Sequence, residues 1–261
     1  TTYSGSDYVM FSDTLSMYPV QDSEKWFEIP VVATNICDYD RSFGVEVDDK
    51  ASNAIEKKQY VVESNTVTIK AGERVAKFRM KGVYENIGKT DSLSVTFNLL
   101  AKDENIWDLY GTRTRVQMQK ACPFELSTFE GYCLLTSSFF SAYMTNTEHR
   151  LLQAERDKAE DNTIILHDFF YKNYDLKIKY DPSDPLKPFV EFDEQIIGST
   201  AEAFGTIYGN GKLMCDQPVA YDSYYNVCQK FVILYTTIYV VGKGTVGTYV
   251  NILEWISDEE A

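Results

Sequence analysis

The chain has 261 residues, of which 44% are hydrophobic and 14% aromatic, so it has enough apolar material for one or two cores and is not intrinsically disordered. Its 39 acidic residues against 25 basic ones give a net charge of −14. This charge argues against a nucleic-acid partner and against docking on an anionic membrane surface, because both need clustered cations.

The first half of the chain reads as a series of short strands. Apolar and polar residues alternate in Thr66–Ile69, Val75–Met80 and Leu93–Phe97, and a period of two is typical of strands with one buried face. Turn-forming residues such as Lys70–Glu73 separate these segments. Short strands at regular spacing indicate a sandwich or a barrel. We therefore predict an all-β domain over residues 1–120.

A second set of predicted strands follows Pro123. These strands are expected over residues 131–135, 163–169, 176–180, 189–193, 205–208, 231–241 and 248–255. We predict a second antiparallel β domain over residues 122–261, and a lipocalin-like barrel and a jelly-roll sandwich fit its strand count equally. Residues 148–161 have helical propensity but no apolar helix face, so a strand followed by a turn is favoured there, with a short helix as the alternative.

Five cysteines stand at positions 37, 122, 133, 215 and 228, and no two of them form a CxxC motif. The missing motif excludes a zinc knuckle and a thioredoxin-like site. An odd count leaves at least one free thiol. Cys122 with Cys133, and Cys215 with Cys228, are close enough in sequence to pair across a hairpin. The alternative is that these cysteines are reduced and buried, since cysteine packs well as a small apolar residue.

Few residues are suited to catalysis. A Ser-His-Asp or Cys-His arrangement would have to use His149 or His167, the two histidines of the chain. His167 lies in an alternating run and is interpreted as a hydrogen-bonded strand histidine, with Asp168 on the opposite face. Glu191 and Asp193 share a predicted strand face, but a pair of carboxylates is always available among 39 acidic residues. We therefore expect no catalytic residues and no enzymatic activity.

Aromatic residues offer a candidate binding site instead. Three tyrosines, an aspartate and an asparagine share one short segment that we expect to be a loop: Tyr221, Asp222, Tyr224, Tyr225 and Asn226. The apolar face of a sugar stacks on an aromatic ring while its hydroxyls bond to carboxylates and amides, so this composition suits a carbohydrate. Phe169–Tyr171 and Tyr174 form a second cluster. For both clusters, packing over the edge of the core is the alternative.

The first half resembles the Calx-β family. Five motifs carry the resemblance: Ala54, Gln59–Tyr60, Val67–Glu73, Val75–Met80 and Leu93–Leu99. The family has an alanine, a spacer and a tyrosine, then a strand ending in Ala-Gly-Glu, a second strand, and a final run that closes on leucine. The resemblance covers roughly residues 1–120 and implies an immunoglobulin-like sandwich.

Calx-β domains often bind calcium through acidic residues clustered at one end. The resemblance implies four candidate ligands: Asp48, Asp49, Glu85 and Asp91. Calcium needs about 6–8 oxygen ligands, several of them from carboxylates. The acidic run that the family carries after the Ala-Gly-Glu strand is here Tyr84–Lys89, which keeps only Glu85. We therefore expect no metal or other cofactor, and calcium at these four residues is the alternative.

A wider resemblance is to surface lipoproteins of gut Bacteroidetes, in which a Calx-β-like domain is joined to a second β domain of unknown function. Phe129–Tyr132, Asn162–Leu166 and Gly247–Val250 carry this resemblance. It implies a secreted protein or a lipoprotein of the outer membrane or cell surface. Contact with the membrane is implied only through a lipid anchor upstream of this chain.

These observations lead to one expected function and two alternatives. We expect a non-catalytic binding or adhesion protein of the cell surface, whose first domain is a rigid spacer and whose second domain presents the ligand-binding face. Its expected partner is a glycan or a surface protein, and not a nucleic acid. The first alternative is a structural or assembly protein of the cell envelope that contacts only other proteins. The second alternative is a glycoside hydrolase.

Overall fold

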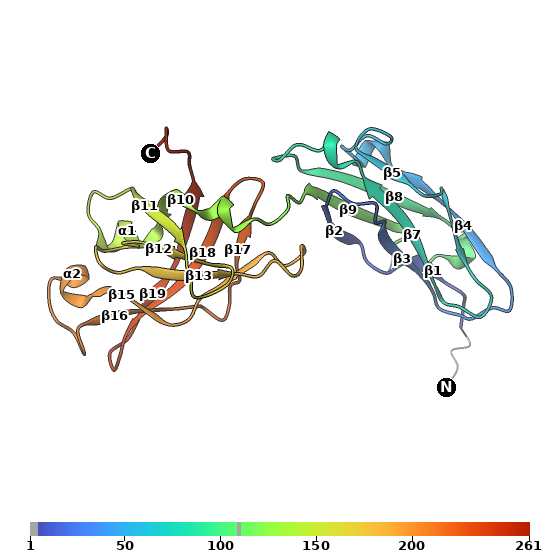
Figure 1. Ribbon diagram of the computed structural model, residues 1–261. Helices are drawn as coiled ribbons and strands as arrows, with labels where there is room; N and C mark the ends of the chain where they lie inside the picture. Colours follow the sequence, from blue (N-terminus) through green and yellow to red (C-terminus); the bar gives the residue numbers. More distant parts are fainter. Residues whose placement is uncertain (1–4, 109–110) are drawn as a thin grey trace. The chain divides into compact units, whose positions relative to one another are not determined.

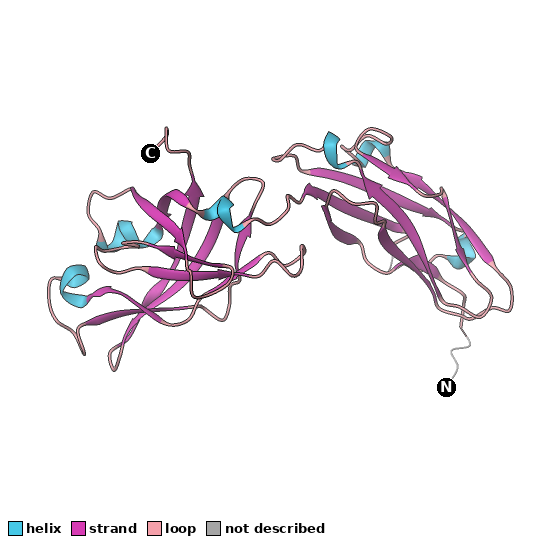
Figure 2. Ribbon diagram, in the orientation of Figure 1, coloured by secondary structure: helices cyan, strands magenta, loops and turns pink. Residues whose placement is uncertain are grey.

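The structure is a computed structural model that describes residues 5–108 and 111–261. The chain divides into two compact units, Thr1–Cys122 and Pro123–Ala261. Strands make up most of the regular structure of both units, and the helices are short (Figure 2). The predicted all-β fold class is confirmed. Among the described helices, none is long and apolar enough to cross a membrane.

The first unit is a sandwich of two sheets (Figure 1). One sheet has the strand order β1-β3-β7-β5 and the other has the order β2-β9-β8-β4-β6. The strands are β1 (Val9–Phe11), β2 (Leu15–Val20), β3 (Phe27–Ala33), β4 (Arg41–Val47), β5 (Tyr60–Val62), β6 (Thr66–Ile69), β7 (Val75–Gly82), β8 (Leu93–Leu100) and β9 (Arg113–Lys120). Strand β2 runs parallel to β9, while the other pairs are antiparallel. This arrangement is the immunoglobulin-like sandwich that the resemblance implied.

Alternate residues of the strands form the core of the sandwich. In β7, Phe78 and Met80 are buried, whereas Lys77 and Arg79 point outward. The ring of Phe78 packs against that of Phe97 from the opposite sheet, with centroids 5.0 Å apart. Each buried side chain of this size contributes about 1.5–3 kcal/mol to folding. The period of two in the sequence therefore decides which side chains hold the two sheets together.

The second unit closes eight strands into a barrel (Figure 1). Their order is β18-β17-β14-β13-β12-β11-β10-β19, and β19 pairs with β18 to complete the ring. The strands are β10 (Gly131–Ser137), β11 (His149–Arg156), β12 (Thr163–Leu166), β13 (Leu176–Tyr180), β14 (Phe189–Glu191), β17 (Ser223–Asn226), β18 (Phe231–Val240) and β19 (Gly244–Trp255). Of the two predicted architectures, the barrel is the one that forms.

Two more strands, β15 (Gln195–Ser199) and β16 (Lys212–Asp216), branch from the barrel along β18. Strand β17 pairs with the first residues of β18, and β16 pairs with its later ones. The side chain of Gln195 joins β15 to β13: its amide oxygen accepts from the Lys177 backbone N–H at 2.8 Å, and its amide nitrogen donates to the Lys177 carbonyl at 2.9 Å. This side chain therefore satisfies backbone groups that a neighbouring strand would otherwise pair.

Two predictions on secondary structure had different outcomes. Residues 148–161 are a strand, β11, followed by a turn, as predicted. The strand predicted over residues 205–208 is wrong, because that segment follows helix α2 (Thr200–Phe204) and is irregular. Ser199 and Glu202 form a capping box that begins α2, and Gly205 ends it in the left-handed conformation with a φ of 71°. The other α-helix, α1 (Ser138–Tyr143), follows β10 directly.

The cysteines do not pair as the hairpin hypothesis predicted. Cys133 and Cys215, one member of each predicted pair, are free thiols, and so is Cys37. Cys133 and Cys215 are fully buried in the core of the barrel, and burial raises the pKa of both thiols. The alternative of buried, reduced cysteines therefore holds for these two residues, because their strands turn them into the apolar interior.

Candidate ligand-binding face

One outward face of the barrel is apolar. Strand β18 alternates strictly, so Val232 and Leu234 point into the core while the residues between them point outward. The outward side chains of β17, β18 and β19, with one residue that precedes β17, form what is called the aromatic face below. Its residues are Tyr221, Tyr224, Phe231, Ile233, Tyr235, Val250 and Ile252.

The register of the three strands makes the aromatic face continuous. Ile233 of β18 lies directly opposite Tyr224 on one side and Ile252 on the other, and Tyr235 lies opposite Val250. Directly opposite side chains have Cβ atoms about 4.5–5.5 Å apart. The face therefore has aromatic rings along β17 and β18 beside an aliphatic column made of Ile233 from β18 with Val250 and Ile252 from β19.

Two pairs of rings stand on the aromatic face. Tyr221 stacks on Tyr235 with ring centroids 5.1 Å apart and an angle of 24° between the planes. Tyr224 meets Phe231 edge-on, with centroids 6.3 Å apart. Tyr221 is 56% exposed and Tyr224 is 39% exposed. Since Tyr235 covers one side of the Tyr221 ring, the other side of that ring is open to solvent.

An outward apolar face is unusual for a sheet that meets water. Antiparallel sheets commonly have one buried apolar face and one polar solvated face. The strand β13 of the same barrel follows this rule, with Lys177 and Lys179 at its outward positions, and so does β7 of the first unit, with Lys77 and Arg79. A contiguous exposed apolar patch marks a surface that binds something. The aromatic face is therefore the candidate functional site.

Polar groups surround the aromatic face. Asp222 is exposed beside Tyr221, and Glu254 is exposed opposite Phe231. Beyond Tyr235, the hydroxyls of Thr237 and Thr248 lie 3.0 Å apart. Carboxylates and hydroxyls at the rim of an apolar platform can accept or donate hydrogen bonds to a ligand that lies on the rings.

The five ligand-binding residues that the sequence predicted do not all lie at the aromatic face. Tyr221, Asp222 and Tyr224 lie at the aromatic face or its rim. Asn226 ends β17 and is half-buried, and its side-chain oxygen accepts from the Gln229 backbone N–H at 2.9 Å. The segment is also not wholly a loop, since its last four residues form β17.

The structure corrects the prediction that Tyr225 contacts a ligand. This side chain is 6% exposed and points into the barrel, where its ring packs 5.2 Å from that of Tyr180. Its hydroxyl donates to the Asp181 carbonyl at 3.2 Å, and burial raises the pKa of Tyr225 to about 12. Alternation along β17 turns Tyr225 to the side opposite Tyr224, so the predicted ligand contact by Tyr225 is wrong.

Phe169, Phe170 and Tyr171 of the second aromatic cluster belong to the core or pack against it, whereas Tyr174 is half-buried outside it. Phe169 and Phe170 are fully buried, and Phe170 stacks on Phe139 of α1 with centroids 4.5 Å apart. Tyr171 has its hydroxyl buried. The packing alternative therefore explains Phe169–Tyr171.

Two of the four candidate calcium ligands, Asp48 and Asp91, are engaged by neighbouring groups, and the other two are Asp49 and Glu85. Asp48 caps the short helix Asp49–Ala51 and pairs with Arg113 at 2.7 Å, and Asp91 accepts from the Gly88 backbone N–H at 2.7 Å. Within residues 5–108 and 111–261, no three acidic, histidine or cysteine side chains are placed to hold a metal ion together.

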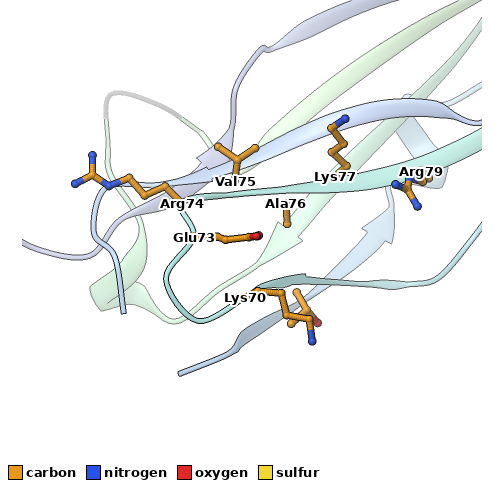
Figure 3. A pocket seen from close by; sticks show the side chains of 8 residues that line it. Lys70, Glu73, Arg74, Val75, Ala76, Lys77 and Arg79 are labelled. Carbon is orange, nitrogen blue, oxygen red and sulfur yellow. The ribbon is translucent and has the colours of Figure 1, made fainter. Parts of the chain in front are cut away.

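A charged groove of about 760 Å³ lies on the first unit (Figure 3). Its cations are largely compensated: Lys70 pairs with Asp40 at 2.8 Å, and Glu28 pairs with both Lys77 and Arg79. Arg74 extends away from the other labelled side chains (Figure 3). Exposed ion pairs of this kind contribute little to stability.

A second depression, of about 520 Å³, lies on the barrel near the branch of β15. Glu191 and Asp193, the carboxylates considered for glycoside hydrolysis, line it together with Lys177 and Gln195. Lys177 is paired with Asp157 at 2.5 Å. The lining is polar, in contrast to the aromatic face, and offers no exposed ring on which a sugar could stack.

His167 lies between carboxylates from two segments of the barrel, and these contacts should make the stability of the barrel depend on pH. Its Nδ1 lies 3.0 Å from Asp175 Oδ2, and its Nε2 lies 3.3 Å from Glu155 Oε1. Partial burial lowers the pKa of His167, but hydrogen bonds and charge from Asp175 and Glu155 raise it more, so the net pKa lies above 6.5. A raised pKa in the folded state contributes stability that is complete below about pH 6.5 and is lost as the pH rises through the folded pKa.

We expect the barrel to be slightly less stable at pH 8 than at pH 6 because of this group. The effect should be below about 1 kcal/mol, since the His167 side chain is 34% exposed and solvent screens its ion pairs. Urea unfolding of the His167→Gln variant at both pH values should show a smaller pH dependence than the parent chain. His149→Gln is the matched control, because His149 bonds to the Thr136 hydroxyl and not to a carboxylate. An unchanged pH dependence in His167→Gln would contradict the assignment.

The described fold and site define a class: a two-unit, all-β protein with an immunoglobulin-like sandwich, a β-barrel and an exposed aromatic face. Residues 109–261 match the family described as domain of unknown function (DUF4984), and the chain belongs to this family. No curated protein is significantly similar to the chain.

Several solved structures are similar to the chain. A protein of unknown function from Bacteroides ovatus is 9% identical, with 94% of this chain and 89% of that chain covered and a TM-score of 0.39. An auxiliary nutrient binding protein from Bacteroides thetaiotaomicron is 10% identical, with 93% and 91% covered and a TM-score of 0.34. The calcium binding domain CBD12 of CALX1.1 is 12% identical, with 61% and 78% covered and a TM-score of 0.36.

These likenesses are too distant to carry any argument about function. The family match, by contrast, covers the whole of the second unit.

Proposed function

We propose that this protein is a non-catalytic binding protein, secreted or held at the cell surface, and that its aromatic face binds carbohydrate. One observation supports this most directly: the exposed ring of Tyr221 stacks on Tyr235, with Tyr224 beside them on a continuous apolar face. The first unit then acts as a rigid spacer that carries no ligand.

A carbohydrate suits this surface chemically. A pyranose ring has C–H groups that pack on an aromatic face and hydroxyls around its edge, which need hydrogen-bond partners. The open side of the Tyr221 ring supplies the platform, and Asp222 supplies an acceptor at the rim. Tyrosine is suited to this task because its ring packs while its hydroxyl stays hydrated.

A second candidate function is a structural or assembly role in the cell envelope, with only proteins as partners. The aliphatic column favours it, because Ile233, Val250 and Ile252 offer branched side chains of the kind found at the core of protein interfaces. A protein partner would cover both columns of the face, whereas a sugar needs mainly the rings.

A glycan array tests the carbohydrate proposal. We expect the purified chain to bind at least one glycan, equally with calcium and with chelator. Tyr221→Ala and Tyr224→Ala should each weaken this binding about five- to tenfold, the loss expected for one aromatic stack. Tyr208→Ala is the matched control, because Tyr208 is 49% exposed in the same unit but lies outside the aromatic face.

The outcomes separate the two candidates. A blank array contradicts the carbohydrate proposal, and so does glycan binding that both tyrosine variants retain in full. If a pull-down from envelope extract then recovers one protein with the parent chain but not with Ile252→Ser, the assembly role is supported in its place.

A further inference from the structure

Resting on the proposed function, we propose that the ligand is an extended, uncharged polysaccharide of equatorially substituted pyranoses. A single terminal sugar and an acidic glycan are the classes that this inference excludes. Three features of the aromatic face support it: its length, its regular sheet geometry and the charges at its rim.

The aromatic face is longer than one sugar ring. Phe231 and Tyr235 are four residues apart on β18, which corresponds to about 13 Å at the rise of an antiparallel strand. Tyr224 lies opposite Ile233 at the middle of this length and meets Phe231 edge-on at one end, while Tyr221 stacks on Tyr235 at the other. The exposed rings of Tyr221 and Tyr224 each pack on a different ring of β18, and two such rings can contact successive sugars of one chain.

The surface under these rings is regular. The pairing of β18 with β19 continues without interruption from Phe231 opposite Glu254 to Ile238 opposite Gly247, and the register shifts only after Ile238, beyond the aromatic face. A regular strand pair keeps alternate side chains on the same face of the sheet along its whole length. Equatorially substituted pyranoses have flat C–H faces that can lie on such a surface, whereas axial substituents would lift the sugar ring away from it.

The rim of the aromatic face disfavours an acidic ligand. Asp222 and Glu254 are exposed beside Tyr221 and Phe231, and Asp216 lies opposite Thr237 at the far end. Lys230 is the cation next to Phe231, and the Glu260 carboxylate is close enough to interact with its charge. With a net charge of −14 on the whole chain, uronate or sulfate groups would be repelled.

Titration calorimetry with a length series tests this inference on the full chain. The probes are cello-, xylo- and manno-oligosaccharides of one to six sugars. We expect no measurable binding of the monosaccharide, an affinity that rises about tenfold or more between the disaccharide and the tetrasaccharide, and a plateau beyond it. Tyr221→Ala should remove most of the gain with length and change the affinity for the disaccharide little, because Tyr224 with Phe231 still holds one end. Tyr208→Ala should behave like the parent chain.

Charge is tested with polymer pairs that share a backbone. Hydroxyethylcellulose is compared with carboxymethylcellulose, and arabinoxylan with glucuronoxylan, by retardation in affinity gels at low salt. We expect the neutral member of a pair to retard the chain more strongly. Full affinity for a monosaccharide, or stronger retardation by the anionic member, overturns this inference and leaves carbohydrate binding in place. No binding to any oligosaccharide, polymer or arrayed glycan overturns the proposed function, and this inference with it.

Discussion

Replacing Asn251 by alanine is expected to destabilise the barrel by about 3–4 kcal/mol, since each polar group left buried and unpaired costs about 1–3 kcal/mol. Asn251 is fully buried in β19. Its side-chain oxygen accepts from the Ser137 hydroxyl at 2.6 Å, and its amide nitrogen donates to the Leu234 carbonyl at 2.8 Å and the Thr236 hydroxyl at 3.0 Å. One amide thus connects the three strands β10, β18 and β19 at the closure of the barrel.

Hydrogen–deuterium exchange of the full chain measures this effect unit by unit. In Asn251→Ala, the amides of β10, β18 and β19 should exchange faster, and the increase in exchange rate should correspond to the lost free energy of unfolding. The amides of the first unit should exchange at the same rate as in the parent chain. Asn226→Ala is the control, because the hydrogen bond that its side chain accepts from Gln229 is exposed, and it should change the stability by less than about 1 kcal/mol. A loss below 1 kcal/mol in Asn251→Ala would mean that the network is dispensable.

The local parts of this fold could be predicted from the sequence, because alternation is a local signal. Runs such as Val75–Met80 and Leu176–Tyr180 became strands whose buried residues are the ones the pattern placed inside. The closure of the barrel is different. Ser137 and Asn251 are 114 positions apart, and nothing in either local segment indicates the other.

The aromatic face has one feature that local alternation could have predicted and one that it could not. Alternation alone could have found that Tyr224 and Tyr225 point in opposite directions, but the neighbouring Asp222 and Asn226 made the segment resemble a loop. The aliphatic column could not be predicted. A long apolar run such as Phe231–Val240 is typical of a strand buried on both faces, so only the three-dimensional arrangement shows that one of its faces is open.

Replacing Arg41 by alanine should cost the first unit about 3 kcal/mol, the lower end of the range for removing one partner of a buried ion pair, because Asp7 keeps some contact with water. The Arg41 side chain is 6% exposed and that of Asp7 is 25% exposed. One terminal nitrogen of Arg41 lies 2.9 Å from each oxygen of Asp7, and the other donates to the carbonyls of Asn35 and Glu73 at 3.1 Å. The guanidinium therefore ties the segment before β1 to the β3–β4 connection and the β6–β7 turn.

Arg41→Lys separates geometry from charge in this prediction. The planar guanidinium reaches a carboxylate and two carbonyls at once, whereas an ammonium on a flexible stem concentrates its donors at one point. We expect lysine to recover less than half of the stability that alanine loses, as measured by exchange of the β1, β3 and β7 amides. Arg115→Ala is the control: Arg115 points outward from β9 and is exposed, so its loss should stay within about 0.5 kcal/mol. If Arg41→Lys matched the parent chain, a positive charge near Asp7 would be sufficient, and the carbonyl contacts would contribute nothing measurable to holding this end of the sandwich together.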